Sequence, residues 1–290
     1  MPRICYNTPM RQDKVLIGTS GYDYPEWKGL FYPLDLKRKD FLSYYAAHFN
    51  ALELNNTFYS MPTAERMLGF YERSQGQLSF SVKANRLLTH EVSPVWREDT
   101  KIFQNAVSPL LEKDCLATVL FQFPQSFHYT NENRIYLSKL IEEFKGFPLV
   151  VEFRHAEWIR KSVFDGLQER GAGIVYCDMP ELKNLPPSVN KLSDALSDGT
   201  DLPAANGGLF YLRLHGRNAA AWYADSTAAG DADNASSRYT YDYSDTELQS
   251  FLPVIQNAVL TGKKPVVFFN NHPNGSGARN AKRLKDLLSI

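Results

Sequence analysis

A segment near the middle of the chain sets two opposite charges at the end of an apolar run. The segment extends from Val150 to Arg154 and reads Val-Val-Glu-Phe-Arg. Side chains alternate along an extended backbone, so Glu152 and Arg154 are expected on one face of a strand, with Val151 and Phe153 on the other. Burying a charged pair costs several kcal/mol of hydration for each ion, which makes this strand end a candidate site.

Polar or charged residues close the other apolar runs of the chain in the same way. If the carboxyl ends of parallel strands meet at one end of a barrel, these side chains share one polar mouth. They are Glu53, Asn55, Lys83, Gln122, Glu152, Arg154, Asp178, Arg213, His215 and Asn270. The simpler alternative is that Glu53 pairs with Lys83, and Glu152 with Arg154, as internal ion pairs that stiffen the mouth.

The residue types at this mouth indicate acid–base chemistry on an anionic substrate. Acids whose pKa values are separated by burial and nearby cations can divide the roles of acid and base. The candidate catalytic residues are Glu53, Glu152, Asp178 and His215. Arginine offers a bidentate fork to phosphate or carboxylate. The candidate substrate-binding residues are Trp27, Asn55, Lys83, Gln122, Arg154, Arg213, Arg217 and Asn270.

A metal centre is the alternative chemistry at the same strand ends. Glu152, Asp178 and His215 offer oxygen and nitrogen ligands from three successive strands. Against this, Arg154 and Arg213 would lie beside the cation, and the sequence has no dense histidine cluster. We therefore expect no cofactor and no metal ligands, and we keep a divalent metal as the alternative.

The loop residues have both a structural and a functional interpretation. His90, His155 and His272 are expected in loops, where a structural role is favoured over a catalytic one. Trp27 and Trp158 could stack on a base or a sugar, or could pack beneath loops.

Strand and helix patterns alternate along the whole chain. The expected strands cover residues 15–21, 52–55, 78–83, 118–124, 150–155, 173–178, 209–217 and 265–271. Apolar residues at helical spacing lie between them, and Ser244 with Glu247 forms a capping box. About eight such pairs without a linker predict one TIM-type (β/α)8 barrel over residues 1–290, with a doubly wound open sheet as the runner-up.

Three segments depart from this regular pattern. Residues 1–13 are expected to be an N-terminal extension. Four prolines interrupt residues 179–208, so the sixth helix region is expected to be irregular, with at most a short helix near residues 189–196. Residues 218–243, after the seventh strand, are rich in small and polar residues and are flanked by aromatic ones, which predicts a long mobile lid loop.

Composition restricts the class of protein. The chain has 32 Lys and Arg against 32 Asp and Glu, so it has no net basic field for general nucleic-acid binding. Cys5, Cys115 and Cys177 are far apart and fit no metal-ligand spacing, which favours a reduced compartment. The first residues contain no apolar run, so neither a secretory signal nor a membrane span is expected. These features predict a cytoplasmic protein that does not bind a membrane.

Short motifs in order along nearly the whole chain resemble the YecE-like family, a domain of unknown function. They are Gly18–Gly21, Trp27–Pro33, Glu53–Tyr59, Lys83, Thr89–His90, Gln122–Pro124, Glu152–His155, Trp158, Asp178, Arg213–Arg217, Phe269–Asn271 and Asn280–Ala281. The first loop departs from the pattern, because Tyr22 stands where members commonly carry tryptophan. The resemblance implies a barrel fold and leaves the activity open.

Three functions remain open from the residues. The first is a hydrolase acting on a phosphorylated or nucleic-acid-like substrate, with Glu152 or Asp178 as base and His215 as acid. The second is a non-catalytic module that binds nucleic acid or another partner, and the third is a sugar-phosphate isomerase with Glu53 or Glu152 as base. A phosphate is expected near Arg213, Arg217 or the backbone of residues 275–277, at the start of the last helix.

Overall fold

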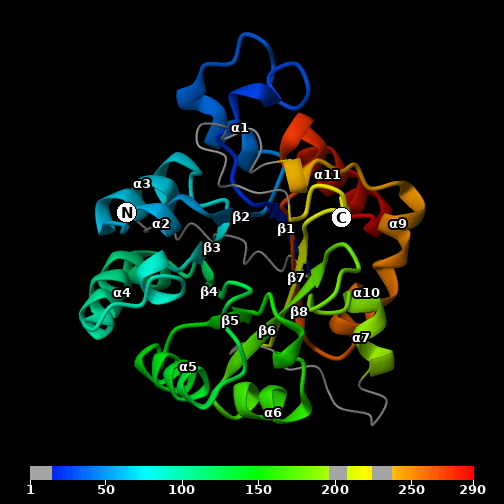
Figure 1. Ribbon diagram of the computed structural model, residues 1–290. Helices are drawn as coiled ribbons and strands as arrows, with labels where there is room; N and C mark the ends of the chain where they lie inside the picture. The colour runs from blue at the N-terminus through cyan, green and yellow to red at the C-terminus, as the bar shows by residue number, and fades with distance from the viewer. Residues whose placement is uncertain (1–14, 196–207, 224–236) are drawn as a thin grey trace.

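The computed structural model describes residues 15–195, 208–223 and 237–290 (Figure 1). The expected N-terminal extension, residues 1–13, lies outside the described residues. So does the middle of the expected lid, residues 224–236, and its mobility stays a prediction. Among the described residues, no helix is long and apolar enough to cross a membrane.

Eight parallel strands form one sheet in the order β1-β8-β7-β6-β5-β4-β3-β2, and helices surround it (Figure 1). The strands are β1 (Leu16–Thr19), β2 (Ala51–Leu54), β3 (Ser79–Lys83), β4 (Leu116–Gln122), β5 (Leu149–Glu152), β6 (Ala172–Asp178), β7 (Leu209–Leu214) and β8 (Lys264–Phe269). This is the predicted TIM-type barrel. The open-sheet alternative is wrong because β1 pairs with β8 and a parallel bridge between Ser20 and Glu53 joins the two ends of this strand order.

The connections between strands carry the helices. The α-helices are α1 (Phe41–Ala46), α2 (Asn56–Tyr59), α3 (Ala64–Arg73), α4 (Trp96–Glu112), α5 (Asn131–Glu143), α6 (Lys161–Glu169), α7 (Val189–Ala195), α9 (Asp245–Ser250), α10 (Leu252–Leu260) and α11 (Ser276–Leu288). Short 3-10 turns are η1 (Pro25–Trp27), η2 (Arg38–Asp40), η3 (Arg86–Leu88), η4 (Ala156–Trp158), η5 (Ser237–Tyr239) and η6 (Pro273–Gly275). The expected short helix in the proline-rich region is confirmed as α7.

The barrel closes between β1 and β2 partly through side chains. Asn50 accepts a hydrogen bond from one backbone amide of this edge of the barrel and donates to a carbonyl there, at 2.8 and 3.0 Å. The Tyr45 hydroxyl accepts from the amide of Thr19 at 2.7 Å and donates to the carbonyl of Ala51 at 3.0 Å. Gly18 permits this approach, since a Cβ atom there would lie 2.0 Å from the Ala51 oxygen.

Strand alternation separates an inner core from an outer one. The side chains of Leu120, Val150, Val175, Tyr211 and Phe268 pack together inside the barrel. Their neighbours along the strands join the larger cluster beneath the helices. A side chain at the end of a strand therefore points into the barrel mouth or under the helix layer, depending only on whether its position in the strand is odd or even.

The predicted capping box at Ser244 and Glu247 is confirmed. The helix that it opens differs from the prediction, because it ends at Ser250 and α10 begins at Leu252. Pro253 lies in the first turn of α10, where its missing amide proton costs nothing.

Candidate functional site

Arg213 is the centre of the barrel mouth. Its two terminal nitrogens each donate a hydrogen bond of 2.6 Å, one to Glu53 and one to Glu152. Arg213 is 2% exposed and both carboxylates are fully buried. A guanidinium can satisfy two acids on opposite edges, so the arginine neutralises charges that would otherwise be costly to bury.

Hydroxyl groups complete the shell around Glu53. Ser20 donates to one carboxylate oxygen at 2.6 Å, and Tyr211 donates to the other at 2.8 Å. The Tyr211 hydroxyl also lies 2.6 Å from that of Ser81. Both oxygens of Glu53 are therefore occupied, and this acid is held in place by β1, β2, β3 and β7.

Arg154 lies beyond the end of β5 and on the inner side, as the alternation predicted. Its Nε is 2.5 Å from a carboxylate oxygen of Glu152, although the angle is not that of a hydrogen bond. One terminal nitrogen donates to Met179 Sδ, a weak acceptor, at 3.4 Å. The other lies 3.3 Å from His215 Nε2, which does not accept a hydrogen bond when it carries the ring proton. The side chain is 12% exposed, so this guanidinium has protons that an anion could accept.

Two arginines keep Glu152 ionised. Burial alone would raise the pKa of its carboxyl, but the charges of Arg154 and Arg213 outweigh burial and lower this pKa well below its usual value. A carboxylate with such a low pKa is a weak base, because it has little affinity for a proton.

His215 is neutral in this environment. Burial, followed by the charge of Arg154, lowers its pKa to about 3. The amide nitrogen of Asn270 lies 2.9 Å from Nδ1. With the amide in this orientation it donates to Nδ1, which puts the ring proton on Nε2, 3.6 Å from Glu152. The ring can donate a hydrogen bond but is not a source of an acidic imidazolium proton.

Lys83 lies at the mouth with a different kind of partner. Its ammonium donates to the amide oxygen of Gln122 at 2.9 Å and lies 4.1 Å from the centre of the Phe58 ring. No carboxylate lies within 4.0 Å of it among the described residues. Burial, with the charge of Arg213 next in size, lowers the pKa of Lys83 to about 7. The predicted ion pair of Glu53 with Lys83 is wrong, because Glu53 pairs with Arg213 instead.

Further polar groups lie near Lys83 and Arg154. Burial and the charges of Lys83 and Arg154 lower the pKa of His90 to about 4, so this ring is neutral. The side-chain oxygen of Asn55 and the Nε of Arg213 are buried, with no hydrogen-bond partner among the described residues. Buried unsatisfied polar atoms are uncommon, so both are candidate ligand contacts.

Asp178 and Arg217 do not join the mouth. In the β6–β7 register Cys177 pairs with Arg213, so Cys177 faces inward and Asp178 faces the helix layer with Leu214. There Arg217 holds both oxygens of Asp178, at 2.8 and 2.9 Å. The expectation that Asp178 opens onto the mouth is therefore wrong, because Val175 and Cys177 face inward and Asp178, the next residue along the strand, faces the opposite way.

Trp27 is also placed away from the mouth. It is fully buried, and its indole nitrogen donates to the carbonyl of His272 at 2.8 Å. This contact ties the first loop to the loop after β8. Trp158 connects the loops after β4 and β5 in the same way, because its indole nitrogen donates to the carbonyl of Phe127 at 2.6 Å. Both tryptophans pack under loops, so neither offers an open face to a ligand.

The inner side contains one group of potential metal ligands that the sequence did not suggest. Glu152, Cys177 and His215 bring ligand atoms within 4.8 Å of one another. The guanidinium of Arg154 contacts two of these residues, so its charge would oppose a cation there. Burial raises the pKa of Cys177 well above its usual value, which also disfavours a thiolate ligand.

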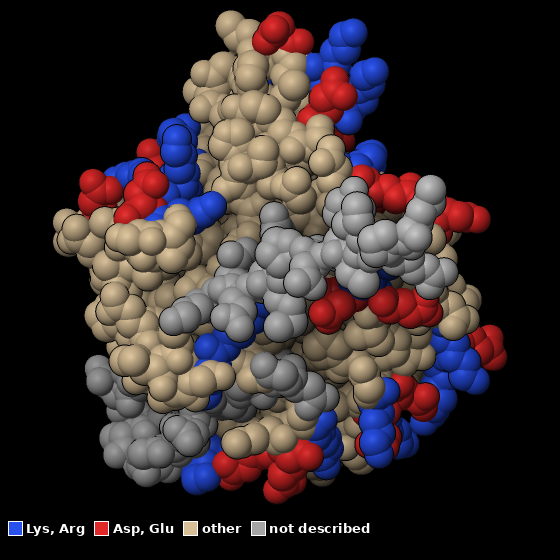
Figure 2. All heavy atoms as spheres, turned by 180° about the vertical axis from the view of Figure 1, so that it is seen from behind, with Lys and Arg blue, Asp and Glu red and all other residues tan. Residues whose placement is uncertain are grey.

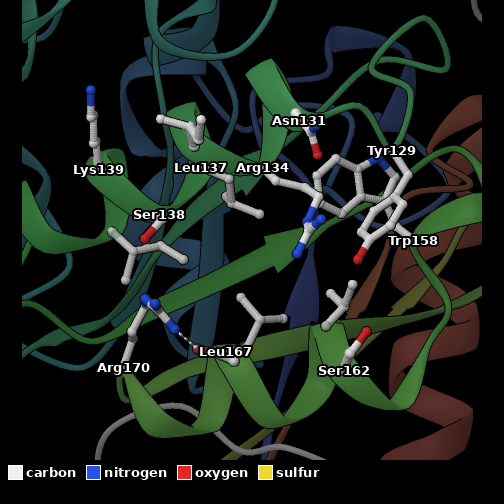
Figure 3. A pocket seen from close by; sticks show the side chains of 14 residues that line it. Tyr129, Asn131, Arg134, Leu137, Ser138, Lys139, Trp158, Ser162, Leu167 and Arg170 are labelled. Atoms are coloured by element: carbon white, nitrogen blue, oxygen red, sulfur yellow. Dashed lines mark hydrogen bonds between the residues drawn. The ribbon is translucent and has the colours of Figure 1, made fainter.

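A surface groove lies away from the mouth. It has a volume of about 560 Å³ and lies between α5 and α6. Figure 3 shows Leu137 and Leu167 pointing toward each other across it, with Arg134 and Arg170 beside them. It contains none of the mouth residues. On the face shown in Figure 2, the described acidic and basic side chains are interspersed in small groups, which does not resemble an extended nucleic-acid surface.

Comparisons with known proteins agree with the fold. A family model described as "Protein of unknown function DUF72" matches residues 16–290. The UPF0759 protein YunF of Bacillus subtilis is 27% identical over 286 residues, which cover 95% of each chain. The UPF0759 protein YecE of Escherichia coli is 25% identical over 62% of this chain and 65% of its own. The crystal structure of a DUF72 family protein from Thermotoga maritima has a TM-score of 0.79 at 32% identity, covering 95% of this chain and 99% of that one.

Proposed function

The chain belongs to the DUF72 family, and from the geometry of its mouth we propose that it is an enzyme that binds an anionic small molecule and moves a proton on it with Lys83. The reaction class is isomerisation next to a carbonyl group, as in a sugar-phosphate isomerase. This proposal keeps the predicted anionic substrate and replaces Glu53 or Glu152 by Lys83 as the base.

The observation that carries this proposal is the unequal pairing of charges at the mouth. Both carboxylates are bound by arginine. Lys83, by contrast, contacts an amide oxygen and an aromatic ring. A partly buried amine with a pKa of about 7 is half protonated at neutral pH, which suits a group that must both accept and return a proton.

Arg154 supports binding of the anion. The charges of Arg154 and Lys83 both act on the neutral His90 and lower its pKa, so these groups lie on the same side of the mouth. Arg213 and Arg217, which were expected to bind phosphate, each hold two carboxylates. An anionic group bound to the terminal nitrogens of Arg154 would leave the amine of Lys83 free to accept the proton. The charge of Arg154 would then also stabilise negative charge that develops on the carbonyl oxygen.

Hydrolysis of a phosphorylated or nucleic-acid-like substrate is less well supported. It needs a base to activate water. Both oxygens of Glu53 accept hydrogen bonds, and the lowered pKa of Glu152 makes it a weak base. It also needs an acid, and His215 is neutral with a pKa of about 3. A purely binding function would leave the low pKa of Lys83 without use. The cytoplasmic location expected from composition stays part of this proposal.

Proton exchange with solvent tests the proposal. The protein is incubated in D2O with a panel of sugar phosphates and hydroxy or keto acids, and deuterium at carbon is followed by NMR. We expect exchange with at least one compound, with a rate that rises through a midpoint near pH 7. Lys83→Met should abolish it, whereas Lys139→Met, a change at an exposed lysine, should not.

Three results would count against the proposal. Exchange that survives Lys83→Met would assign the proton transfer to another group. Phosphate release without exchange would favour a hydrolase. Calorimetric binding of a panel compound without any turnover would favour the binding module.

A further inference from the structure

Three potential ligand atoms lie together at the rim of the barrel, outside the mouth. His128 is in the loop after β4, and His155 with Glu157 is in the turn after β5. One carboxylate oxygen, Glu157 Oε2, is 3.3 Å from His128 Nδ1 and 3.6 Å from His155 Nδ1. The three ligand atoms all lie within 4.8 Å of one another.

These separations match those around a small tetrahedral cation. Zinc bonds to histidine nitrogen and carboxylate oxygen are about 2.0–2.2 Å long, and a tetrahedron with such bonds has edges of about 3.3–3.6 Å. Both distances from the Glu157 oxygen already fall in this range. The remaining edge, between the two histidine nitrogens, would need to shorten only if it lies near its upper limit of 4.8 Å.

We propose that His128, His155 and Glu157 form a binding site for Zn²⁺ or a similar borderline divalent cation. Two imidazoles and one carboxylate suit zinc, cobalt or nickel, whereas calcium and magnesium prefer oxygen ligands. With Glu157 and His128 about half exposed, the fourth position is open to water.

The protonation state of His155 supports this role. The backbone amide of Glu157 donates to His155 Nδ1 at 3.2 Å, so this nitrogen carries no proton and has a lone pair that a cation could take in place of the amide. Metal binding would replace this hydrogen bond from the backbone amide and the contact between His128 and Glu157. The amide of Tyr129 donates to Glu157 Oε2 at 3.2 Å, which fixes the carboxylate from the other loop.

The surrounding frame already holds the two loops together. Trp158 stacks on Phe127 and Phe153, with ring centres 5.1 and 4.5 Å apart, and so joins the loops that supply the ligands. Rigid support of this kind lowers the cost of ordering ligands. The guanidinium of Arg160 lies over Tyr129 at 4.6 Å and opposes a cation, so we expect moderate affinity. A metal here would act as a clip between two loops and take no part in the chemistry at Lys83.

Titration of the metal-free protein with ZnCl2, followed by calorimetry and thermal unfolding, tests the site. We expect one equivalent to bind and raise the melting temperature, with EDTA reversing the shift, while CaCl2 and MgCl2 have no effect. CoCl2 should give the visible absorption of a four-coordinate site. His128→Ala and Glu157→Gln should each weaken binding by about tenfold or more. Both side chains are exposed enough for these variants to fold.

Matched controls separate this site from adventitious binding. His48→Gln removes a histidine just after the end of α1, and Glu132→Gln removes an exposed acid in the first turn of α5. Neither should change zinc affinity. The proposal is overturned if zinc does not bind, if His128→Ala and Glu157→Gln bind as tightly as the wild type, or if the control variants lose affinity equally.

Discussion

Two clusters of similar composition, each with one arginine, two acids and a tyrosine, lie on opposite faces of the barrel wall. In the inner cluster, Arg213 joins Glu53 and Glu152, and Tyr211 donates to an acid. The outer cluster has the same arrangement around Arg217, four residues after Arg213.

There Arg217 joins Asp178 and Glu247, and Tyr243 donates to Asp178 at 2.8 Å. The arginine is 2% exposed in the inner cluster and 33% exposed in the outer one. Composition is therefore a poor guide to role, and access to water distinguishes the two clusters. The inner cluster lies within reach of Lys83 and a ligand, while the outer one joins α9 to the barrel.

The largest expected difference follows removal of each arginine. Arg213→Met leaves Glu53 buried without a cation, while Glu152 keeps Arg154. We expect a loss of about 3–5 kcal/mol in the free energy of unfolding. The measurement is urea unfolding at pH 7. Because protonation of one acid would relieve the repulsion, the loss should shrink at pH 5. A loss that is the same at both values would mean that the acids do not interact in the variant.

Acid titration should affect the inner cluster strongly. The pKa of Glu152 is well below 4.5 in the folded protein and near 4.5 in the unfolded chain. The contribution of Glu152 to the free energy of unfolding is therefore fully present above about pH 4.5. It is lost as the pH falls through the pKa that Glu152 has in the folded protein. We expect this loss to be on the order of 2 kcal/mol. Unfolding of the wild type and of Glu152→Gln between pH 6 and 3 measures it, and parallel curves would refute it.

Arg217→Met should cost less than Arg213→Met, about 1–2 kcal/mol, because water can reach Asp178 once the partly exposed arginine is removed. Proton exchange at the mouth should remain, since the outer cluster does not touch Lys83. The same urea experiment measures the stability. An equal loss for both arginines would remove the distinction between the clusters.

The smallest effects concern the tyrosines. Tyr243→Phe removes one hydrogen bond to Asp178 and leaves the amide of Gly216 without its acceptor, 2.9 Å away. Tyr211→Phe removes a bond to Glu53. We expect losses of about 1 kcal/mol for each. Only Tyr211→Phe should also alter exchange at the mouth, because it changes the position of Glu53. An effect of Tyr243→Phe on exchange would connect the two clusters.

Much of the fold could be predicted from the sequence. Apolar runs, helical stripes and the capping box at Ser244 depend on neighbours in the chain, and they predicted eight strands and the barrel. Alternation also placed Glu152 and Arg154 together on the inner side. These features are local, since a period of two or of 3.6 residues is written in the chain itself.

Tertiary structure alone decided which charges meet. Glu53 could pair with Lys83 by its place in the chain, yet the barrel brings Arg213 to it from the opposite side. Asp178 was expected at the mouth because it ends the apolar run of β6, but the face of β6 that lies toward the barrel interior is the one that carries Cys177. Partner choice depends on distances between strands far apart in sequence, and the strong pairing of both acids with arginine is what leaves Lys83 without a carboxylate among the described residues. The sequence determines which charged residues lie at the strand ends, and closure of the barrel determines how they pair. The reason is that ion pairing in a buried site depends on distances of a few ångströms between side chains on different strands, which the local sequence pattern does not determine.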